Sequence, residues 1–194
     1  MTELTVVVST YNKLRELELV LIALQYQTFN NFEVIVAEDG ANSKIKEFIN
    51  NNKSNYFYKI IHLTQKDIGF RKNKILNKAI ANSNTDFIIF IDGDCIPHSE
   101  FVKQHYLNKT ENTVLCGKRV NLSQKLSEKI SIDYITSKQY ESEHLEKLID
   151  SLKTKDKRTT FIEEGFYVDN LLLNKLVKIK KPKLLGCNFS IHKK

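Results

Sequence analysis

The strongest constraint on the fold is a regular alternation of short apolar runs with helical periodicity through the first 107 residues. The run TVVVST at residues 5–10 is continuous and β-branched, which is typical of a buried strand. Leucines then recur at positions 14, 17, 21 and 24, which is the spacing of one helix face. The same alternation predicts strands over 32–39, 58–63, 85–92 and 112–120, and helices over 15–25, 43–52, 71–82 and 99–107.

This order of elements indicates an α/β fold with a Rossmann-like, mostly parallel sheet flanked by helices. Because the predicted strands are nearly continuous apolar runs, we expect helices to cover both faces of the sheet. The alternation ends near residue 120. Residues 123–152 are predicted to be helical, residues 183–191 to form a late strand, and residues 159–170 fit neither pattern.

Length and composition suit a single soluble domain. The 194 residues are 41% hydrophobic and 27% charged, which is ordinary for a globular protein. No apolar run approaches the about 20 residues of a membrane span. The first residues also lack the basic region of a signal peptide. We therefore expect a cytoplasmic protein.

The net charge of +7 favours an anionic partner. Two stretches, residues 153–158 and 175–183, are strongly basic. A solvated face is the simpler interpretation, and peripheral contact with the inner face of the cell membrane or with an acidic acceptor is the alternative. We expect no nucleic-acid partner, because no helix-turn-helix, zinc-finger or RNA-recognition signature is present in the sequence.

The three cysteines, Cys95, Cys116 and Cys187, lie far apart in the sequence. An odd count without metal-type spacing argues against a disulfide framework and against a zinc site. We therefore predict three buried free thiols.

The sequence FIDGDC at residues 90–95 places two carboxylates at the end of a predicted buried strand. Asp-Gly pairs often mark hairpins, but a proline and a helix start near Ser99 leave no room for a return strand. Two interpretations remain, a strand-to-helix turn or a divalent-cation site. In the second, Asp92 and Asp94 supply the oxygen ligands that hard cations prefer. Ligands of parallel α/β sheets bind beyond the carboxyl ends of the strands, where these residues lie.

Five segments of the chain together resemble the family 2 glycosyltransferases, which have the GT-A fold. They are VVVSTYNK, VAEDG, FRKNKILNKAI, FIIFIDGDCIPHSEF and the late GCNFSIHKK. The order and spacing match over residues 4–107, and the last segment resembles the family's G-C-N motif. The resemblance implies a nucleotide-sugar-binding half over 1–120. It also implies an acceptor-side helical region and late strand over 121–194, within the same domain.

The resemblance implies inverting transfer of a sugar from a nucleoside-diphosphate donor to a glycan or lipid-linked acceptor, with Mn²⁺ or Mg²⁺ as cofactor. UDP is the donor nucleotide by analogy alone. Asp94 would ligate the metal, and Asp92 would contact the ribose or the metal and its water. The implied nucleotide-binding residues are Ser9, Thr10, Tyr11, Asn12, Asp39, Arg71 and Lys74, with Asp39 at the base and the two basic residues at the phosphates. Cys187 and Asn188 would lie near the sugar.

Simpler roles stay open for some of these residues. Tyr11 would either stack on the base or belong to the core. Arg71 and Lys74 would either contact phosphates or be surface charges on a helix.

No residue of this chain matches the position of the family's general base. Family members continue beyond the G-C-N motif into a tryptophan-glycine segment with a Glu-Asp pair, whereas this chain has no tryptophan and stops at Lys194. We therefore expect a chain that is short at its C-terminus and lacks the base. Glu163 or Glu164 as a substitute base, and His192 as a second metal ligand, are alternatives within the chain.

Two other functions are alternatives to the transferase. A catalytically silent nucleotide-sugar binding module would keep the acidic residues and lack the base, as this chain does. A nucleotidyltransferase is disfavoured, because such enzymes carry a glycine-rich loop after the first strand and STYNKLRE contains no glycine.

Overall fold

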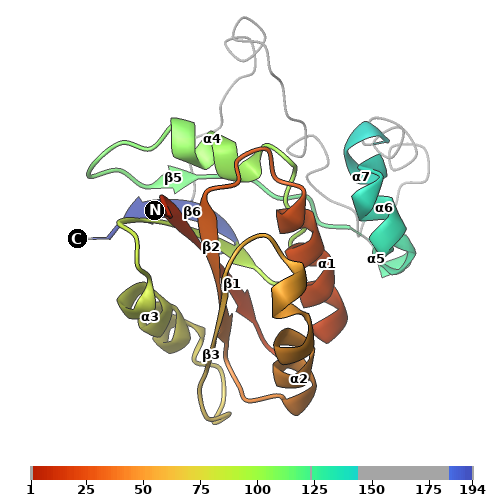
Figure 1. Ribbon diagram of the computed structural model, residues 1–194, viewed down its shortest axis with the longest axis horizontal. Helices are drawn as coiled ribbons and strands as arrows, with labels where there is room; N and C mark the ends of the chain where they lie inside the picture. The colour runs from red at the N-terminus through yellow and green to blue at the C-terminus, as the bar shows by residue number, and fades with distance from the viewer. Residues whose placement is uncertain (1, 123, 144–183, 194) are drawn as a thin grey trace, which may run out of the picture. The chain divides into compact units, whose positions relative to one another are not determined.

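The computed structural model describes residues 2–122, 124–143 and 184–193. Its centre is a six-stranded sheet in the order β3-β2-β1-β4-β6-β5 (Figure 1). The strands are β1 (Leu4–Thr10), β2 (Phe32–Glu38), β3 (Ile60–Thr64), β4 (Phe87–Asp92), β5 (Leu115–Cys116) and β6 (Asn188–His192). The predicted α/β fold with a mostly parallel sheet is confirmed.

The strand β1 lies at the middle of the parallel part of the sheet. It pairs in parallel with β2 on one side and with β4 on the other, and β2 in turn pairs in parallel with β3. The late strand β6 pairs with the outer edge of β4 in the antiparallel direction. The carboxyl ends of β1, β2 and β4 therefore meet at one edge of the sheet, the edge at which ligands bind in such folds.

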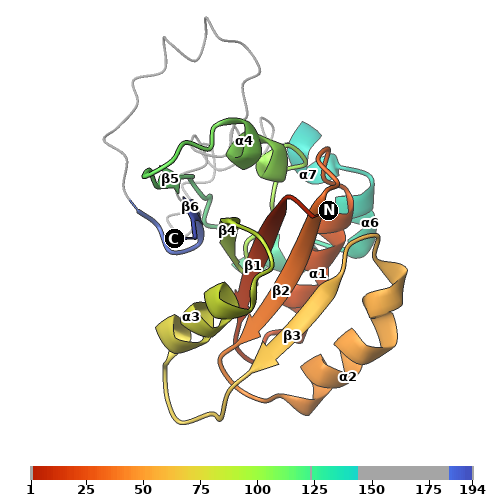
Figure 2. The same ribbon diagram turned by 60° about the vertical axis from the view of Figure 1, so that its left-hand side comes forward.

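Helices cover both faces of this sheet, as its apolar strands require. One face carries α1 (Leu14–Gln25), α2 (Ser43–Asn52) and α4 (Phe101–Leu107), whose apolar side chains share a core with Val6, Val8 and Ile89. The other face carries α3 (Lys72–Asn82), which packs on Val7 and Ile88 (Figure 2). Alternate residues of β1 thus enter opposite cores, because successive side chains of a strand point to opposite faces.

Local sequence explains where α2 begins. The side chain of Asn42 accepts hydrogen bonds from the backbone N–H groups of Lys44 and Ile45, at 2.9 and 3.4 Å, and so caps the helix. A short 3₁₀ helix, η1 (Lys53–Asn55), follows it. Ile45 and Ile49, one turn apart in α2, then face the core.

The prediction of a strand over 112–120 was wrong in extent, since β5 has only two residues. Asn112 has a left-handed backbone, with φ of 59°, and Val114 is 51% exposed. This turn and this exposure leave no buried face to hold a longer strand in the sheet. The late strand likewise begins at Asn188 rather than at residue 183.

Part of the predicted helical region after residue 122 lies within the described residues. It forms α5 (Gln124–Lys129), α6 (Ile132–Thr136) and α7 (Gln139–Ser142). The remainder of 123–152, the segment 159–170, both basic stretches and the pair Glu163 and Glu164 lie outside the described residues. Across the part of the chain that the structure places, no helix has both the length and the apolar character to cross a bilayer. The cytoplasmic location stays a prediction.

The chain divides into two compact units. The first comprises residues 1–115 with 186–194, and the second comprises residues 116–185. The late strand therefore belongs with the parallel sheet, and the predicted division at residue 120 stays a prediction.

Two leucines on helices test this description of the core. Leu24 in α1 is fully buried, and Leu107 at the end of α4 is 64% exposed. Leu24→Ala is expected to lower the free energy of unfolding by about 3 kcal/mol, because it removes apolar contact and leaves a cavity. Leu107→Ala is expected to change it by about 0.5 kcal/mol or less. Urea denaturation of both variants measures the difference, and equal losses would contradict the packing.

Candidate functional site

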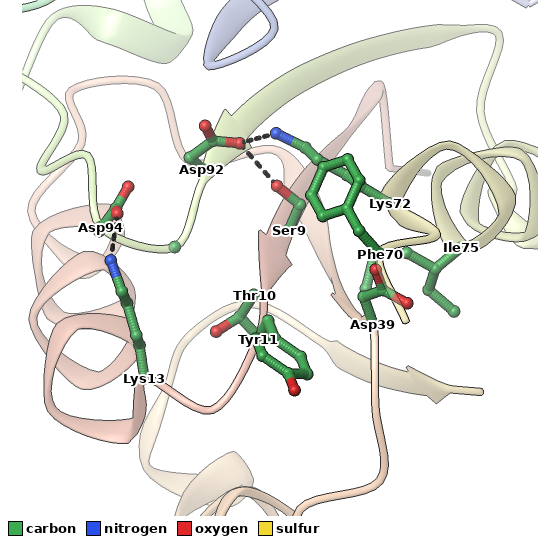
Figure 3. Close-up of a pocket in the computed structure, with 12 residues that line it drawn as sticks. Ser9, Thr10, Tyr11, Lys13, Asp39, Phe70, Lys72, Ile75, Asp92 and Asp94 are labelled. Carbon is green, nitrogen blue, oxygen red and sulfur yellow. Dashed lines mark hydrogen bonds and ion pairs between the residues drawn. The ribbon is translucent and has the colours of Figure 1, made fainter. Parts of the chain in front are cut away.

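A pocket lies at the carboxyl edge of the sheet, where β1, β2 and β4 end (Figure 3). Register brings its parts together, since Ser9 of β1 lies beside Asp92 of β4 and Thr10 lies beside Glu38 of β2. The pocket is lined by Ser9, Thr10, Tyr11, Lys13, Ala37, Asp39, Phe70, Lys72, Ile75, Asp92, Gly93 and Asp94.

Gly93 allows the end of β4 to press against β1. Its N–H donates to the carbonyl of Ser9 at 2.7 Å. A Cβ atom at this position would lie 3.0 Å from that carbonyl oxygen and from the Thr10 Cβ, so no larger residue fits without movement. The chain then turns, with the Cys95 N–H donating to the Asp92 carbonyl at 3.0 Å, and continues toward α4 without a return strand. Asp92-Gly93-Asp94 is therefore a strand-to-helix turn that also carries two carboxylates to the pocket.

Each of these two carboxylates has an ammonium partner. The Oδ1 atom of Asp92 accepts from the Ser9 hydroxyl at 2.7 Å and from the Nζ atom of Lys72. The Oδ2 atom of Asp94 accepts from the Nζ atom of Lys13 at 2.8 Å. Figure 3 shows the two lysines reaching the acidic tip from opposite sides.

Lys13 keeps Asp94 ionised. Burial acts to raise the pKa of Asp94, but the hydrogen bond and the charge of Lys13 outweigh it and hold that pKa below its ordinary value. Asp94 is accordingly an anion at neutral pH. Both side chains are about half exposed, at 56% for Lys13 and 43% for Asp94, so solvent screens the pair.

Asp39 fastens the loop between β3 and α3 to the pocket. Its side chain accepts from the Gln65 amide at 2.5 Å and from the Arg71 backbone N–H at 2.7 Å, one bond to each oxygen. The residue is 5% exposed. Since a carboxylate oxygen accepts two hydrogen bonds, each oxygen retains capacity for a further donor.

Two aromatic rings border the pocket. Tyr11 is 51% exposed and donates its hydroxyl to Asp67 at 3.1 Å, so the alternative that it belongs to the core was wrong. Phe70 is 89% exposed and follows Gly69, whose φ of 88° is a conformation that favours glycine. Figure 3 shows that the rings reach the pocket from different segments.

Three of the predicted nucleotide-binding residues are not among those lining the pocket. Asn12 adopts a left-handed backbone, and its side chain accepts from the Asn42 amide at 2.9 Å. Arg71 donates through its guanidinium to the carbonyl of Lys66, and Lys74 is exposed on α3. Their roles toward a ligand stay predictions, as do those of the residues that do line the pocket.

The two predicted sugar-site residues lie next to the acidic tip, Asn188 as the first residue of β6 and Cys187 just before it. The antiparallel register pairs Ile91 with Asn188, which places Cys187 opposite Asp92. His105 of α4 fixes Asn188, with its Nε2 atom 2.9 Å from Asn188 Oδ1 and its Nδ1 atom 2.8 Å from Ser190 Oγ. A neutral ring protonated at Nε2 satisfies both contacts, because that nitrogen donates to the amide oxygen while Nδ1 accepts from the hydroxyl.

His192 is not placed as a second metal ligand, so that alternative was wrong. It pairs with Phe87 at the amino end of β4, and its ring lies 5.0 Å from the Phe87 ring. Asp92 lies five residues further along the same strand, about 16 Å away at the usual rise of a strand.

The sequence did not assign five of the lining residues to the site, namely Lys13, Ala37, Phe70, Lys72 and Ile75. Lys13 lies in the loop between the predicted strand over 5–10 and the predicted helix over 15–25, where periodicity predicts no structure. Phe70 offered the clearest signal, since it is a large apolar residue between a predicted strand and a predicted helix, outside the apolar pattern of both.

The family model for Glycosyl transferase family 2 matches residues 5–157. Chondroitin synthase of Escherichia coli is 28% identical over 138 residues, which is 70% of this chain and 20% of that protein. The uncharacterized glycosyltransferase YfnE of Bacillus subtilis is 26% identical over 191 residues, which is 90% of this chain and 46% of that protein. The chain thus spans less than half the length of these relatives.

A solved structure shares the fold. The mannosyltransferase PcManGT from Pyrobaculum calidifontis, in complex with GDP-Man and Mn²⁺, superposes with a TM-score of 0.52 at 18% identity. The match covers 60% of this chain and 36% of that one.

The environment of His105 predicts a pH dependence of stability. Burial lowers the pKa of His105 below its ordinary 6.5, despite the opposing hydrogen bond to Asn188. Below pH 6.5 the His105 side chain binds a proton in the unfolded chain more readily than in the folded chain. The free energy of unfolding therefore decreases as the pH falls through this range. His105→Gln is expected to be less stable at pH 7 and to lose less further stability between pH 7 and pH 5.5. Denaturant titrations at both pH values test this, and an unchanged difference would refute it.

Proposed function

This chain belongs to glycosyl transferase family 2, and on that premise we propose that its pocket binds a nucleoside-diphosphate sugar with a divalent cation. We further propose inverting transfer of the sugar from UDP to a glycan or lipid-linked acceptor. The observation that carries the proposal is the acidic tip, where Asp92 and Asp94 face one pocket and each is balanced by a lysine ammonium.

The donor set fits a hard divalent cation. Mn²⁺ and Mg²⁺ prefer carboxylate, phosphate and water oxygens. Each carboxylate already accepts a hydrogen bond from a lysine ammonium, so positive charge is accommodated beside both. Asp94, with Asp92 beside it, would hold the cation. The cation would neutralise the negative charge that develops on the diphosphate as the sugar leaves.

The two lysines have a second role in this proposal. A cation that takes over the carboxylates frees the ammonium groups of Lys13 and Lys72, which remain in the pocket lining. Free ammonium groups beside a bound diphosphate favour its charge. In this arrangement the protein exchanges internal ion pairs for contacts to the donor.

The remaining lining residues suit a nucleoside. Asp39 supplies acceptor oxygens at a nearly buried position, as recognition of a base N–H requires. Tyr11 and Phe70 present exposed rings on which a planar base can stack, and stacking on aromatic side chains is a general mode of base binding. The Tyr11 hydroxyl and the Asp39 carboxylate both contact the loop over residues 65–71 that carries Phe70.

Calorimetric titration of UDP tests the cation and Asp94 together. We expect binding with Mn²⁺, none with EDTA, and an affinity at least about tenfold lower in Asp94→Asn, equivalent to ~1.4 kcal/mol. Asp86→Asn is the control, because Asp86 is exposed just before the other end of β4 and should bind as the unchanged protein does. Binding that ignores both the cation and Asp94 would refute the proposal.

Phe70 allows a separate test of nucleoside stacking. The chain has no tryptophan, so Phe70→Trp introduces a single indole fluorophore. UDP with Mn²⁺ is expected to quench it, whereas inorganic pyrophosphate with Mn²⁺ is not, because only UDP carries a base. Phe70→Ala should weaken UDP binding by about 1–3 kcal/mol.

Ile68 provides the matched control on the same loop. It is 59% exposed and does not line the pocket. Ile68→Trp should report little quenching, and Ile68→Ala should leave UDP affinity unchanged. Equal quenching at both positions would mean that the signal does not arise from stacking on Phe70.

A further inference from the structure

Two cysteines from distant parts of the sequence meet at Asp92. One ligand atom each from Asp92, Cys95 and Cys187 lies within 4.8 Å of the others. Neither thiol is in a disulfide, and Cys187 is only 2% exposed while Cys95 is half-buried. The sequence spacing of the cysteines argues against a zinc site. Spacing along the chain does not, however, reveal side chains that the sheet brings together.

Two structural features produce this cluster. The antiparallel register of β4 and β6 places Cys187 directly across from Asp92. The turn that follows β4, closed by the bond from the Cys95 N–H to the Asp92 carbonyl, returns Cys95 toward the same point. Both features belong to well-packed parts of the first compact unit, where Phe90 stacks on Phe189 at 4.5 Å.

We propose that Asp92, Cys95 and Cys187 form a binding site for a thiophilic divalent cation such as Zn²⁺. Thiolate sulfur selects Zn²⁺ over Mn²⁺ and Mg²⁺, which prefer oxygen. Ligand atoms around a tetrahedral Zn²⁺ lie roughly 3.4–3.8 Å apart, given its usual bond lengths. Side-chain rotations that close the cluster by about 1 Å reach this geometry. Binding releases two thiol protons to solvent and leaves a fourth position for water.

This site is distinct from the hard-cation site because it uses sulfur, but the two sites share Asp92. The Cys95 thiol also lies 3.7 Å from Asp94 Oδ1, so a cation held by the thiolates crowds the second carboxylate. Occupation by Zn²⁺ therefore excludes the donor's cation. This regulatory consequence rests on the proposed function, whereas the binding of the thiophilic cation does not.

Cd²⁺ titration without nucleotide tests the site itself. Thiolate coordination of Cd²⁺ gives an ultraviolet charge-transfer band, and a phosphine reductant keeps both thiols reduced. We expect a band that saturates at one Cd²⁺ per chain, is displaced by Zn²⁺, and is unaffected by a large excess of Mg²⁺. A missing band, or saturation at a different stoichiometry, would overturn the site.

Cysteine variants assign the ligands. Cys95→Ser and Cys187→Ser should each weaken Cd²⁺ binding by about 100-fold or more, since each removes one of two thiolates. Cys116→Ser is the matched control and should keep the full band, because Cys116 is outside the cluster. If Cys187→Ser fails to fold, as judged by circular dichroism, the half-buried Cys95→Ser decides alone. An unchanged band in Cys95→Ser, or a lost band in Cys116→Ser, would refute the assignment.

A competition experiment tests the consequence. One equivalent of Zn²⁺ should abolish Mn²⁺-dependent UDP binding in the unchanged protein, and Cys95→Ser should resist this effect. UDP binding that persists beside saturated Zn²⁺ would overturn the regulatory proposal. Failure of UDP to bind under any condition would instead refute the proposed function, and the Cd²⁺ band would stand independently of it.

Discussion

The close approach of β4 to β1 at Gly93 is the constraint on which the acidic pocket depends. The 2.7 Å hydrogen bond from Gly93 to Ser9 holds the ends of the two strands together. With no Cβ at this position, the carboxylates of Asp92 and Asp94 project beyond the strand while the backbone between them stays in contact with β1. A larger residue would push the tip away from Ser9 and separate Asp92 from its hydroxyl partner.

Concentrating carboxylates at one edge raises an electrostatic cost, which the lysines offset. Asp39, Asp92 and Asp94 all line one pocket, and like charges at short range repel one another. Lys13 and Lys72 supply compensating charge from the loop after β1 and from the first turn of α3. In the proposed function, a cation that displaces both lysines also costs two ion pairs. A polyanionic ligand that accepts the released ammonium groups would reduce this cost.

The sequence predicted the sheet and the acidic tip because both arise from local patterns. Buried β-branched runs and helical periodicity are visible over ten residues, and so is Asp-Gly-Asp at a strand end. It did not single out Lys72, whose ammonium reaches Asp92, since the direction of this side chain depends on how α3 packs against the sheet. It also extended the strand after residue 112 too far and left His192 open as a ligand, since exposure of Val114 and the register of β6 are properties of the assembled sheet.

The antiparallel strand β6 brings residues from the end of the described chain next to the pocket. A parallel neighbour in its place would have directed Cys187 and Asn188 to the opposite edge of the sheet, because the residues before a parallel strand lie at its amino end. The antiparallel direction instead places these two residues beside Asp92, and His105 then holds Asn188 from α4. Residues nearly a hundred positions apart in the sequence thus lie beside the same carboxylate. A single strand reversal at the edge of a parallel sheet can thus place a thiol and an amide beside the carboxylates that end the parallel strands.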